Sequence, residues 1–145
     1  MLFICSATAA EPDEDHHIKL TKEVVASGDI ISQLISGEPV RYDNVTISGS
    51  LELAELQGSL SQPIKITNSI FLGPIRFAAA SFDEPIDLQG CIFRDNVDFF
   101  GCRFAGGAGF AGVTFEGQAD LRNTYFGGQA SFLSAQFSED ASFRN

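Results

Sequence analysis

The sequence contains few of the side chains that usually carry out catalysis. Its only two histidines are His16 and His17, so none occurs from Thr46 onward, and Lys65 is the only lysine in that part. General acid and base catalysis needs a group that titrates near neutral pH, and a nucleophile needs a partner that activates it. The sequence therefore predicts no enzyme, no catalytic residue and no cofactor site.

Long apolar runs and positive charge are also scarce. No stretch approaches the roughly 20 apolar residues of a membrane-spanning helix. Lys plus Arg number 9 against 19 Asp plus Glu, a formal net charge of −10, which argues against a surface for nucleic acid or anionic lipid. With 44% hydrophobic residues among 145, the chain can nonetheless bury the core of one domain.

Residues 1–10 are interpreted as a truncated signal peptide. A short apolar stretch precedes small residues, with Ala7 and Ala9 in the −3 and −1 pattern of a cleavage site. The lack of a basic start leaves two alternatives, a true start further upstream or a chance pattern. Ile4 before Cys5 does not suit a lipoprotein, because a small residue is expected there. We expect an exported, extracellular or membrane-associated protein, with a cytoplasmic one as the alternative.

Residues 11–26 are interpreted as an acidic leader that includes His16 and His17. These histidines are not assigned to a metal, because no other histidine or free cysteine is placed to complete a coordination shell. We therefore predict a solvated leader and no metal ligand in the chain.

Residues 27–59 are predicted to hold one short amphipathic helix and the strand that leads into the following coils. Apolar residues at 30, 31, 34 and 35 repeat at helical spacing. Ser27 or Asp29 can cap the start of this helix, and Gly37 with Pro39 ends it. The expected role of the segment is to cover the unpaired edge of the first coil.

A repeat of large apolar residues dominates the rest of the chain, 60–145. The gaps between them alternate between six and five, so the unit has eleven residues and two units make 22. The series is Leu60, Ile66, Phe71, Phe77, Phe82, Leu88, Phe93, Phe99, Phe104, Phe110, Phe115, Leu121, Phe126, Phe132, Phe137 and Phe143. Two residues before each member stands a residue no bulkier than Ile, and residues two apart on an extended backbone face the same side. Both columns are therefore predicted to face inward as the structural core.

Turn-forming pairs recur every eleven residues between these positions, among them Gly73-Pro74, Glu84-Pro85 and Gly106-Gly107. Proline lacks the N–H that a strand ladder needs, so these sites are corners. Short strands with a turn after each can bury two columns only by winding into stacked coils. The predicted fold is an all-β solenoid whose core is a stack of Phe rings.

The repeat resembles the pentapeptide-repeat family. Residues 119–123, 130–134 and 141–145, which begin Ala-Asp-Leu, Ala-Ser-Phe and Ala-Ser-Phe, are similar to its A(D/N)Lxx pattern, with Phe often in place of the central Leu. The resemblance implies a right-handed quadrilateral β-helix, here of about four coils with two slightly enlarged corners. The segment before it resembles the capping helix of a secreted microbial subgroup. That subgroup implies coils that stand in front of a membrane-embedded, channel-like domain.

Other apparent motifs fit the repeat better than they fit a site. Gly107-Ala-Gly109-Phe-Ala-Gly112 matches a dinucleotide-binding fingerprint in spelling, but it lies in phase with the repeat and not between a strand and a helix. Cys91 and Cys102 occupy equivalent inward positions, where we expect small core fillers and neither a disulfide nor a metal pair.

Outward charges are expected to meet those of the next coil. A period of 22 places Arg76 beside Asp98 and Asp120, and Arg94 beside Glu116. Such exposed pairs contribute about 0–1 kcal/mol each. Asp98 beside Asp120 leaves two interpretations, a weak cation site or two solvated carboxylates, of which we favour the second.

These observations favour a non-catalytic structural or interaction module, an exported acidic rod that binds an unknown protein partner. We expect its open C-terminal coil to pair with a second copy or to continue into a longer chain. The alternative is a mimic of DNA that binds DNA gyrase, as some pentapeptide-repeat proteins do. Residues 46–145 carry 11 acidic and 6 basic side chains, a net −5 and only half of the total, which weakens this alternative.

Overall fold

The computed structural model describes residues 22–54, 56 and 58–145. The predicted signal peptide and the leader up to residue 21, with Cys5, His16 and His17, lie outside the described residues. Within that described range, no helix is long and apolar enough to cross a membrane.

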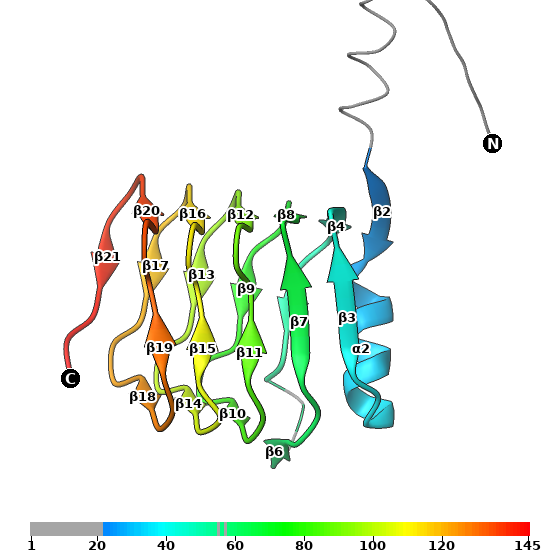
Figure 1. The fold of residues 1–145 in the computed structure, drawn as a ribbon, viewed down its shortest axis with the longest axis horizontal. Coiled ribbons are helices and arrows are strands. Elements are labelled where there is room, and N and C mark those ends of the chain that lie inside the picture. Colours follow the sequence, from blue (N-terminus) through cyan, green and yellow to red (C-terminus); the bar gives the residue numbers. More distant parts are fainter. Residues whose placement is uncertain (1–21, 55, 57) are drawn as a thin grey trace, which may run out of the picture.

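The described chain winds into a parallel β-solenoid of about five turns, preceded by one helix, α2 (Ser27–Ser36). Figure 1 shows the coils stacked side by side, with α2 at the N-terminal end. Each coil passes through four faces, and each face is a parallel sheet built from successive coils. We name the faces after the strands of one coil: the β10, β11, β12 and β13 faces.

The strands of each face are as follows, in the order in which they lie side by side. The β10 face contains β18 (Tyr125–Phe126), β14 (Arg103–Phe104), β10 (Ser81–Phe82) and β6 (Ser59–Leu60). The β11 face contains β19 (Ala130–Ser131), β15 (Ala108–Gly109), β11 (Ile86–Asp87), β7 (Ile64–Thr67) and β3 (Val40–Asp43). The β12 face contains β2 (Glu23–Ala26), β4 (Val45–Ser48), β8 (Ile70–Phe71), β12 (Ile92–Phe93), β16 (Thr114–Phe115) and β20 (Gln136–Phe137). The β13 face contains β21 (Ala141–Ser142), β17 (Ala119–Asp120), β13 (Val97–Asp98), β9 (Ile75–Arg76) and β5 (Leu51–Glu52).

The register between coils follows the predicted period of 22. Phe82 stands beside Phe104, and Phe104 beside Phe126. The first coil differs: Val40 pairs with Ile64, an offset of 24, so it holds two more residues than the later coils. The prediction of about four coils covered residues 60–145, and the first coil, with β3, β4 and β5, adds one turn. The hand of the solenoid stays a prediction.

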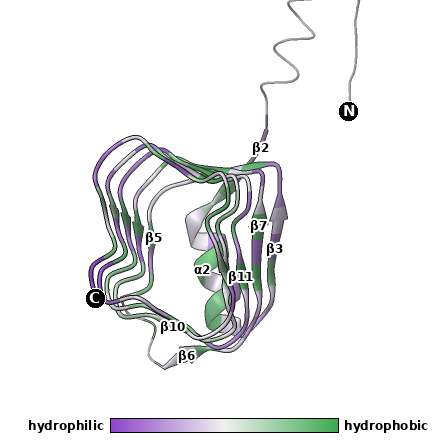
Figure 2. Ribbon diagram, turned by 60° about the vertical axis from the view of Figure 1, so that its left-hand side comes forward, coloured by the Kyte–Doolittle hydropathy of each residue, from purple (hydrophilic) through white to green (hydrophobic). Residues whose placement is uncertain are grey.

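The predicted column of large apolar residues forms most of one buried core cluster. Figure 2 shows hydrophobic residues interspersed with hydrophilic ones along the ribbon of the coils. Rings of neighbouring coils stack, with centroids 5.2 Å apart between Phe82 and Phe104 and 4.7 Å apart between Phe71 and Phe93. Rings from adjacent faces meet edge to face, as Phe99 and Phe104 do at 88°. Offset stacks and edge-to-face contacts are the geometries that aromatic pairs prefer, so the repeat period also sets the ring geometry.

Two of the four corners use left-handed backbone conformations that recur coil after coil. One corner has positive φ at Asn68, Gly90 and Gly112, and the other at Ala79, Gly101 and Asn123. The N–H of each of these residues donates to a carbonyl of the next coil, for example Gly90 to Ala111 at 2.9 Å. Each coil thus forms a backbone hydrogen bond with the next at these corners, so the coils stay in register at the turns as well as along the strands.

The N-terminal end is covered by α2 and β2. Ile30 and Leu34 of the helix are buried against the first coil, and Gln62 donates a hydrogen bond to the Leu34 carbonyl at 2.7 Å. The helix ends at Ser36, and Gly37, which was predicted to end it, is its C-cap in a left-handed conformation. Its N-cap differs from the prediction: Ala26 holds that position and no side chain caps the helix, because β2 runs directly into it. Residues 23–26, assigned to the leader above, are strand β2 and pair with β4.

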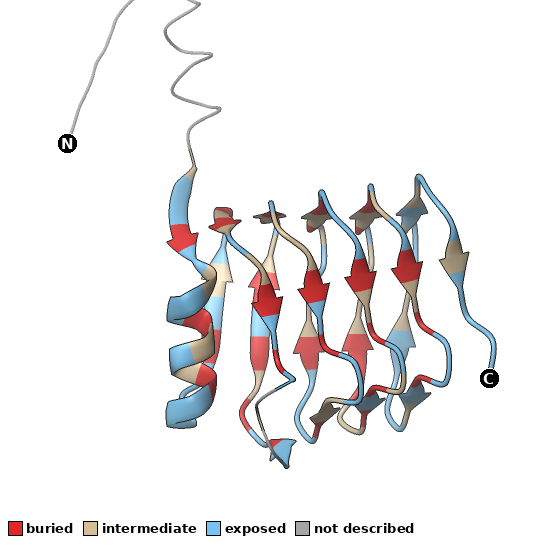
Figure 3. Ribbon diagram, turned by 180° about the vertical axis from the view of Figure 1, so that it is seen from behind, coloured by how far each residue is buried: buried red, intermediate tan, exposed pale blue. Residues whose placement is uncertain are grey.

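The large apolar residues of the last coil are less buried than predicted. Ten members of the series from Phe71 to Leu121 are buried, namely Phe71, Phe77, Phe82, Leu88, Phe93, Phe99, Phe104, Phe110, Phe115 and Leu121. Phe126, Phe132 and Phe137 are only partly buried, and Phe143 is 48% exposed. Figure 3 shows this loss of burial toward the C-terminal end. These four rings keep the register but have neighbours on one side only, because no coil of the described chain follows them.

Candidate functional site

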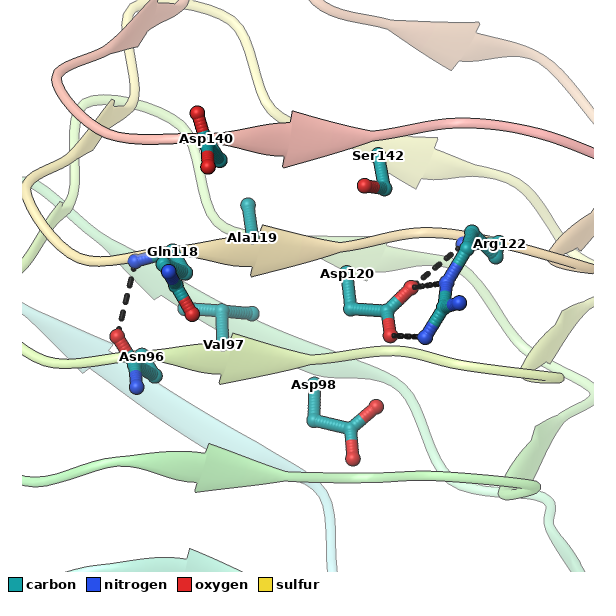
Figure 4. Close-up of a pocket in the computed structure, with 9 residues that line it drawn as sticks. All are labelled: Asn96, Val97, Asp98, Gln118, Ala119, Asp120, Arg122, Asp140 and Ser142. Carbon is teal, nitrogen blue, oxygen red and sulfur yellow. Dashed lines mark hydrogen bonds and ion pairs between the residues drawn. The ribbon is translucent and has the colours of Figure 1, made fainter.

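The carboxylates that the sequence offers as a candidate site lie on the β13 face. A hollow of about 460 Å³ lies on this face, lined among others by Asp98, Asp120, Arg122 and Asp140 (Figure 4). Asp98 and Asp120 stand in register on neighbouring strands, as predicted. The hollow therefore brings together the only carboxylate pair that the sequence raised as a possible ion site.

Arg122 provides a positive charge beside one of the two carboxylates, that of Asp120. Its guanidinium donates two hydrogen bonds to Asp120, from Nε to Oδ1 at 2.9 Å and from Nη2 to Oδ2 at 2.6 Å. These bonds, aided by the backbone N–H and the charge of Arg122, lower the pKa of Asp120 below its usual value. Asp98 Oδ1 accepts a hydrogen bond from the Phe100 N–H at 2.9 Å. Asp120 thus has its own counter-charge, which supports the solvated interpretation over a cation site.

The period of 22 does not predict this pairing, because it relates charges on neighbouring coils and not within one coil. Residues i and i+2 at the end of a strand can meet when a turn follows, and Asp120 and Arg122 do so. Arg76 is beside Asp98 in register, but its guanidinium pairs with Glu52 of the preceding coil. Arg94 and Glu116 form the predicted pair, at 3.3 Å. All of these side chains are at least partly exposed, so their ion pairs add little stability.

The two described cysteines are buried and unpaired with each other. Each thiol donates to a carbonyl of the preceding coil, Cys91 to Ile66 at 3.1 Å and Cys102 to Phe77 at 2.9 Å. Burial raises the pKa of each thiol to about 12, so neither is a reactive thiolate. Thr124, one coil after Cys102, makes the same bond to Phe99 at 2.9 Å. These inward positions thus hold small donors that satisfy buried carbonyls.

Other candidate sites also lie within the repeat. In residues 22–54, 56 and 58–145, no three His, Cys, Asp or Glu side chains are grouped to hold a metal ion. Gly107 directly precedes β15, and Gly109 is its last residue. The next element is another strand of the coil, where a dinucleotide site would need a helix. Gly107 has a positive φ of 102° and packs against the backbone of Gln129 in the next coil, so stacking explains that glycine.

Comparison with known protein families agrees with this geometry. The family model "Pentapeptide repeats (9 copies)" matches residues 99–145. These coils are pentapeptide repeats. No curated protein and no solved structure matches the chain. The described coils before residue 99 share the register and inward columns of these pentapeptide repeats, from β6 onward. Pentapeptide-repeat solenoids are typically non-enzymatic, and the family suggests a structural or interaction module.

Proposed function

We propose that this protein is an exported, non-catalytic binding module, a rigid acidic rod that presents its surfaces and its end to a protein partner. The observation that carries the proposal is the regular stack of coils, whose residues 99–145 match the pentapeptide repeats, a family that suggests a structural or interaction module. Phe126, Phe132, Phe137 and Phe143 are partly buried or exposed, although each continues the buried columns of the coils before it. A further coil of a longer chain or a second copy of this chain would cover these rings and the free strand edge equally.

The proposed occupant of this end is a second copy of the chain or a continuation of the solenoid in a longer chain. Helix α2 covers the opposite end, with its own Ile30 and Leu34 buried against the first coil. A second copy that extends the stack can therefore approach only through β18 to β21. This leaves a symmetric pair joined end to end, in which each copy covers the rings of the other.

Export and the membrane context rest on the signal-like residues 1–10 and on the resemblance to a secreted subgroup. The experiment expresses the chain with residues 1–10 intact in an exporting host. Light scattering and intact mass are then measured on the same purified sample. A cleaved dimer would support the proposal in full. A cleaved monomer would retain export and remove the pairing, whereas an uncleaved species that aggregates would point to a fragment of a longer chain and remove the export assignment.

DNA mimicry with gyrase as the target is the alternative, and one observation favours it. Residues 81–145 carry nine Asp and Glu against four Arg, a net −5, and Asp98, Asp120 and Asp140 line one hollow. Four interspersed arginines interrupt this acidic surface, which is why the binding module is preferred. Gyrase supercoiling measured with micromolar protein separates the two. Unchanged supercoiling would eliminate the alternative, and inhibition that depends on Asp98 and Asp140 would replace our first proposal.

A further inference from the structure

One corner of the solenoid differs from the rest of this acidic surface. Between the β13 and β10 faces, two neighbouring coils present residues 100–103 and 122–125. The outward side chains are Phe100 and Arg103 in one coil and Arg122 and Tyr125 in the next. Arg144 follows Arg122 by one period, and its carbonyl accepts from the Asn123 N–H at 3.0 Å. We call these five residues the Arg–aromatic corner.

The two aromatic rings of the corner are exposed, and an arginine guanidinium lies over the face of each. The Cζ atom of Arg103 lies 4.7 Å from the centroid of the Tyr125 ring, and that of Arg122 lies 5.5 Å from the Phe100 ring. Phe100 is 40% and Tyr125 53% exposed, while most other aromatic side chains in the described residues fill the core. Stacking on the rings holds two long arginine side chains in place, which lowers the entropy lost when they bind a ligand.

The charge of the corner is opposite to that of the protein. Residues 78–81, 100–103, 122–125 and 144, which line the corner over four coils, contain three arginines and no carboxylate. Asp120 engages Arg122 from the β13 face. Among the described residues, Arg103 and Arg144 form no ion pair. The corner thus offers two guanidiniums without a carboxylate partner, in a chain of formal net charge −10.

A hollow of about 280 Å³ completes the surface, lined by Phe100, Arg122, Asn123, Arg144 and Asn145. It provides an aromatic wall, two amides and two guanidiniums, that of Arg122, which pairs with Asp120, and that of Arg144, which forms no ion pair in the described residues. Tyr, Phe and Arg are the side chains enriched at the centres of protein interfaces, where they contribute most of the binding energy. At an outward position of a coil, Ser or Asn would satisfy the fold equally well, so stacking alone does not account for this set.

We propose that the Arg–aromatic corner binds a short acidic segment of a partner protein, with its carboxylates on Arg103 and Arg144 and an apolar side chain on the exposed rings. The proposal rests on the proposed function as a binding module. Strands of neighbouring coils are about 4.8 Å apart, so Arg103 and Arg144, nearly two coils apart, are separated by about 9 Å along the axis. Residues three apart on an extended peptide are about 10 Å apart, so one segment along the axis can place a carboxylate on each. A duplex or a membrane would extend past the corner and meet Asp98 and Asp140 on the β13 face, which favours a short segment.

The probe for the test is a peptide of six glutamates, titrated into the full ¹⁵N-labelled chain at low salt. We expect shifts in the backbone amides of residues 100–103 and 122–125 and in the Nε–H signals of Arg103 and Arg144. Arg103→Gln should weaken binding about fivefold, since interface arginines are often hot spots. Arg41→Gln is the matched control, because Arg41 is also exposed, forms no ion pair in the described residues and removes the same charge. It should change the affinity less than about twofold.

The inference is wrong if no signal of the corner shifts, or if both variants weaken binding equally, since that would mean unspecific attraction between charges. It is also overturned if a short DNA duplex or vesicles with anionic lipid shift the same signals at lower concentration than the peptide. The light-scattering experiment above is independent of this corner. If the protein is a cleaved dimer but the signals of the corner do not shift with the peptide, this inference is refuted and the proposed function remains.

Discussion

Phe104→Ala tests whether the stacked rings stabilise the solenoid. Phe104 is fully buried in the middle of the stack, in a coil with neighbours on both sides. Its ring contacts four others at centroid distances of 5.2–6.1 Å, those of Phe82, Phe99, Phe110 and Phe126. The substitution would leave a cavity that no adjacent backbone can fill, because the hydrogen bonds of both neighbouring coils hold the spacing.

The expected loss follows from burial and from the cavity. Truncation of a buried Phe to Ala costs about 3–5 kcal/mol in the free energy of unfolding. We expect the upper half of that range, because each lost ring pair adds about 0.5–1.5 kcal/mol to the area term. Phe100→Ala is the control: Phe100 is 40% exposed and its removal opens no enclosed cavity, so we expect about 1–2 kcal/mol.

The assay is chemical denaturation followed by far-ultraviolet circular dichroism, since the chain has no tryptophan. If Phe104→Ala does not fold, Phe104→Leu keeps the comparison possible. Leucine occupies the same inward column at Leu60, two coils before Phe104, where it is buried, so this change should cost about 1.5 kcal/mol or less. Equal losses for Phe104→Ala and Phe100→Ala, or no loss for Phe104→Ala, would refute the argument that the inward column carries the stability.

Two further predictions concern the inward polar groups. Thr124→Val removes the hydroxyl that donates to the buried Phe99 carbonyl and should cost about 1–3 kcal/mol, whereas Thr114→Val, on the outward side of β16, should cost under about 0.5 kcal/mol. Equal denaturation midpoints for the two variants would mean that this bond adds nothing. In a Cys5→Ser chain, Cys91 and Cys102 should not react with a thiol reagent near pH 8, because burial raises the pKa of both thiols to about 12. Both should react after denaturation, and rapid labelling of the folded protein would contradict the described burial.

The architecture could be predicted because the signal is periodic. A large residue every five or six positions, a smaller one two before it and a turn pair after it leave few packings, and all of them stack coils at 22 residues. The inward placement of Phe71 to Leu121 and the αL glycine at the end of α2 followed from the same local reasoning. The Arg94–Glu116 pair was predictable too, since the period alone brings those residues together.

The candidate sites were less predictable, because the period says which residues are neighbours and not where their side chains turn. Arg76 could reach either neighbouring coil, and it pairs with Glu52 because the longer first coil brings that carboxylate beside it. Arg122 pairs with Asp120, two residues away in its own coil. The Arg–aromatic corner was equally hidden, since Phe100 and Tyr125 fall outside the repeat and only the corner between faces aligns them with the arginines.

The sequence by itself determined the solenoid, the register of the coils from Leu60 onward and the inward columns, because local alternation with turns every eleven residues can bury the Phe column only in stacked coils. Only the tertiary structure decided which edges are covered. It placed β2 in the β12 face and Ala26 at the helix N-cap, and it left Phe143 exposed although its position in the repeat equals that of Phe77. The physical reason is that burial in a stack depends on both neighbouring coils, which the period within one coil does not specify.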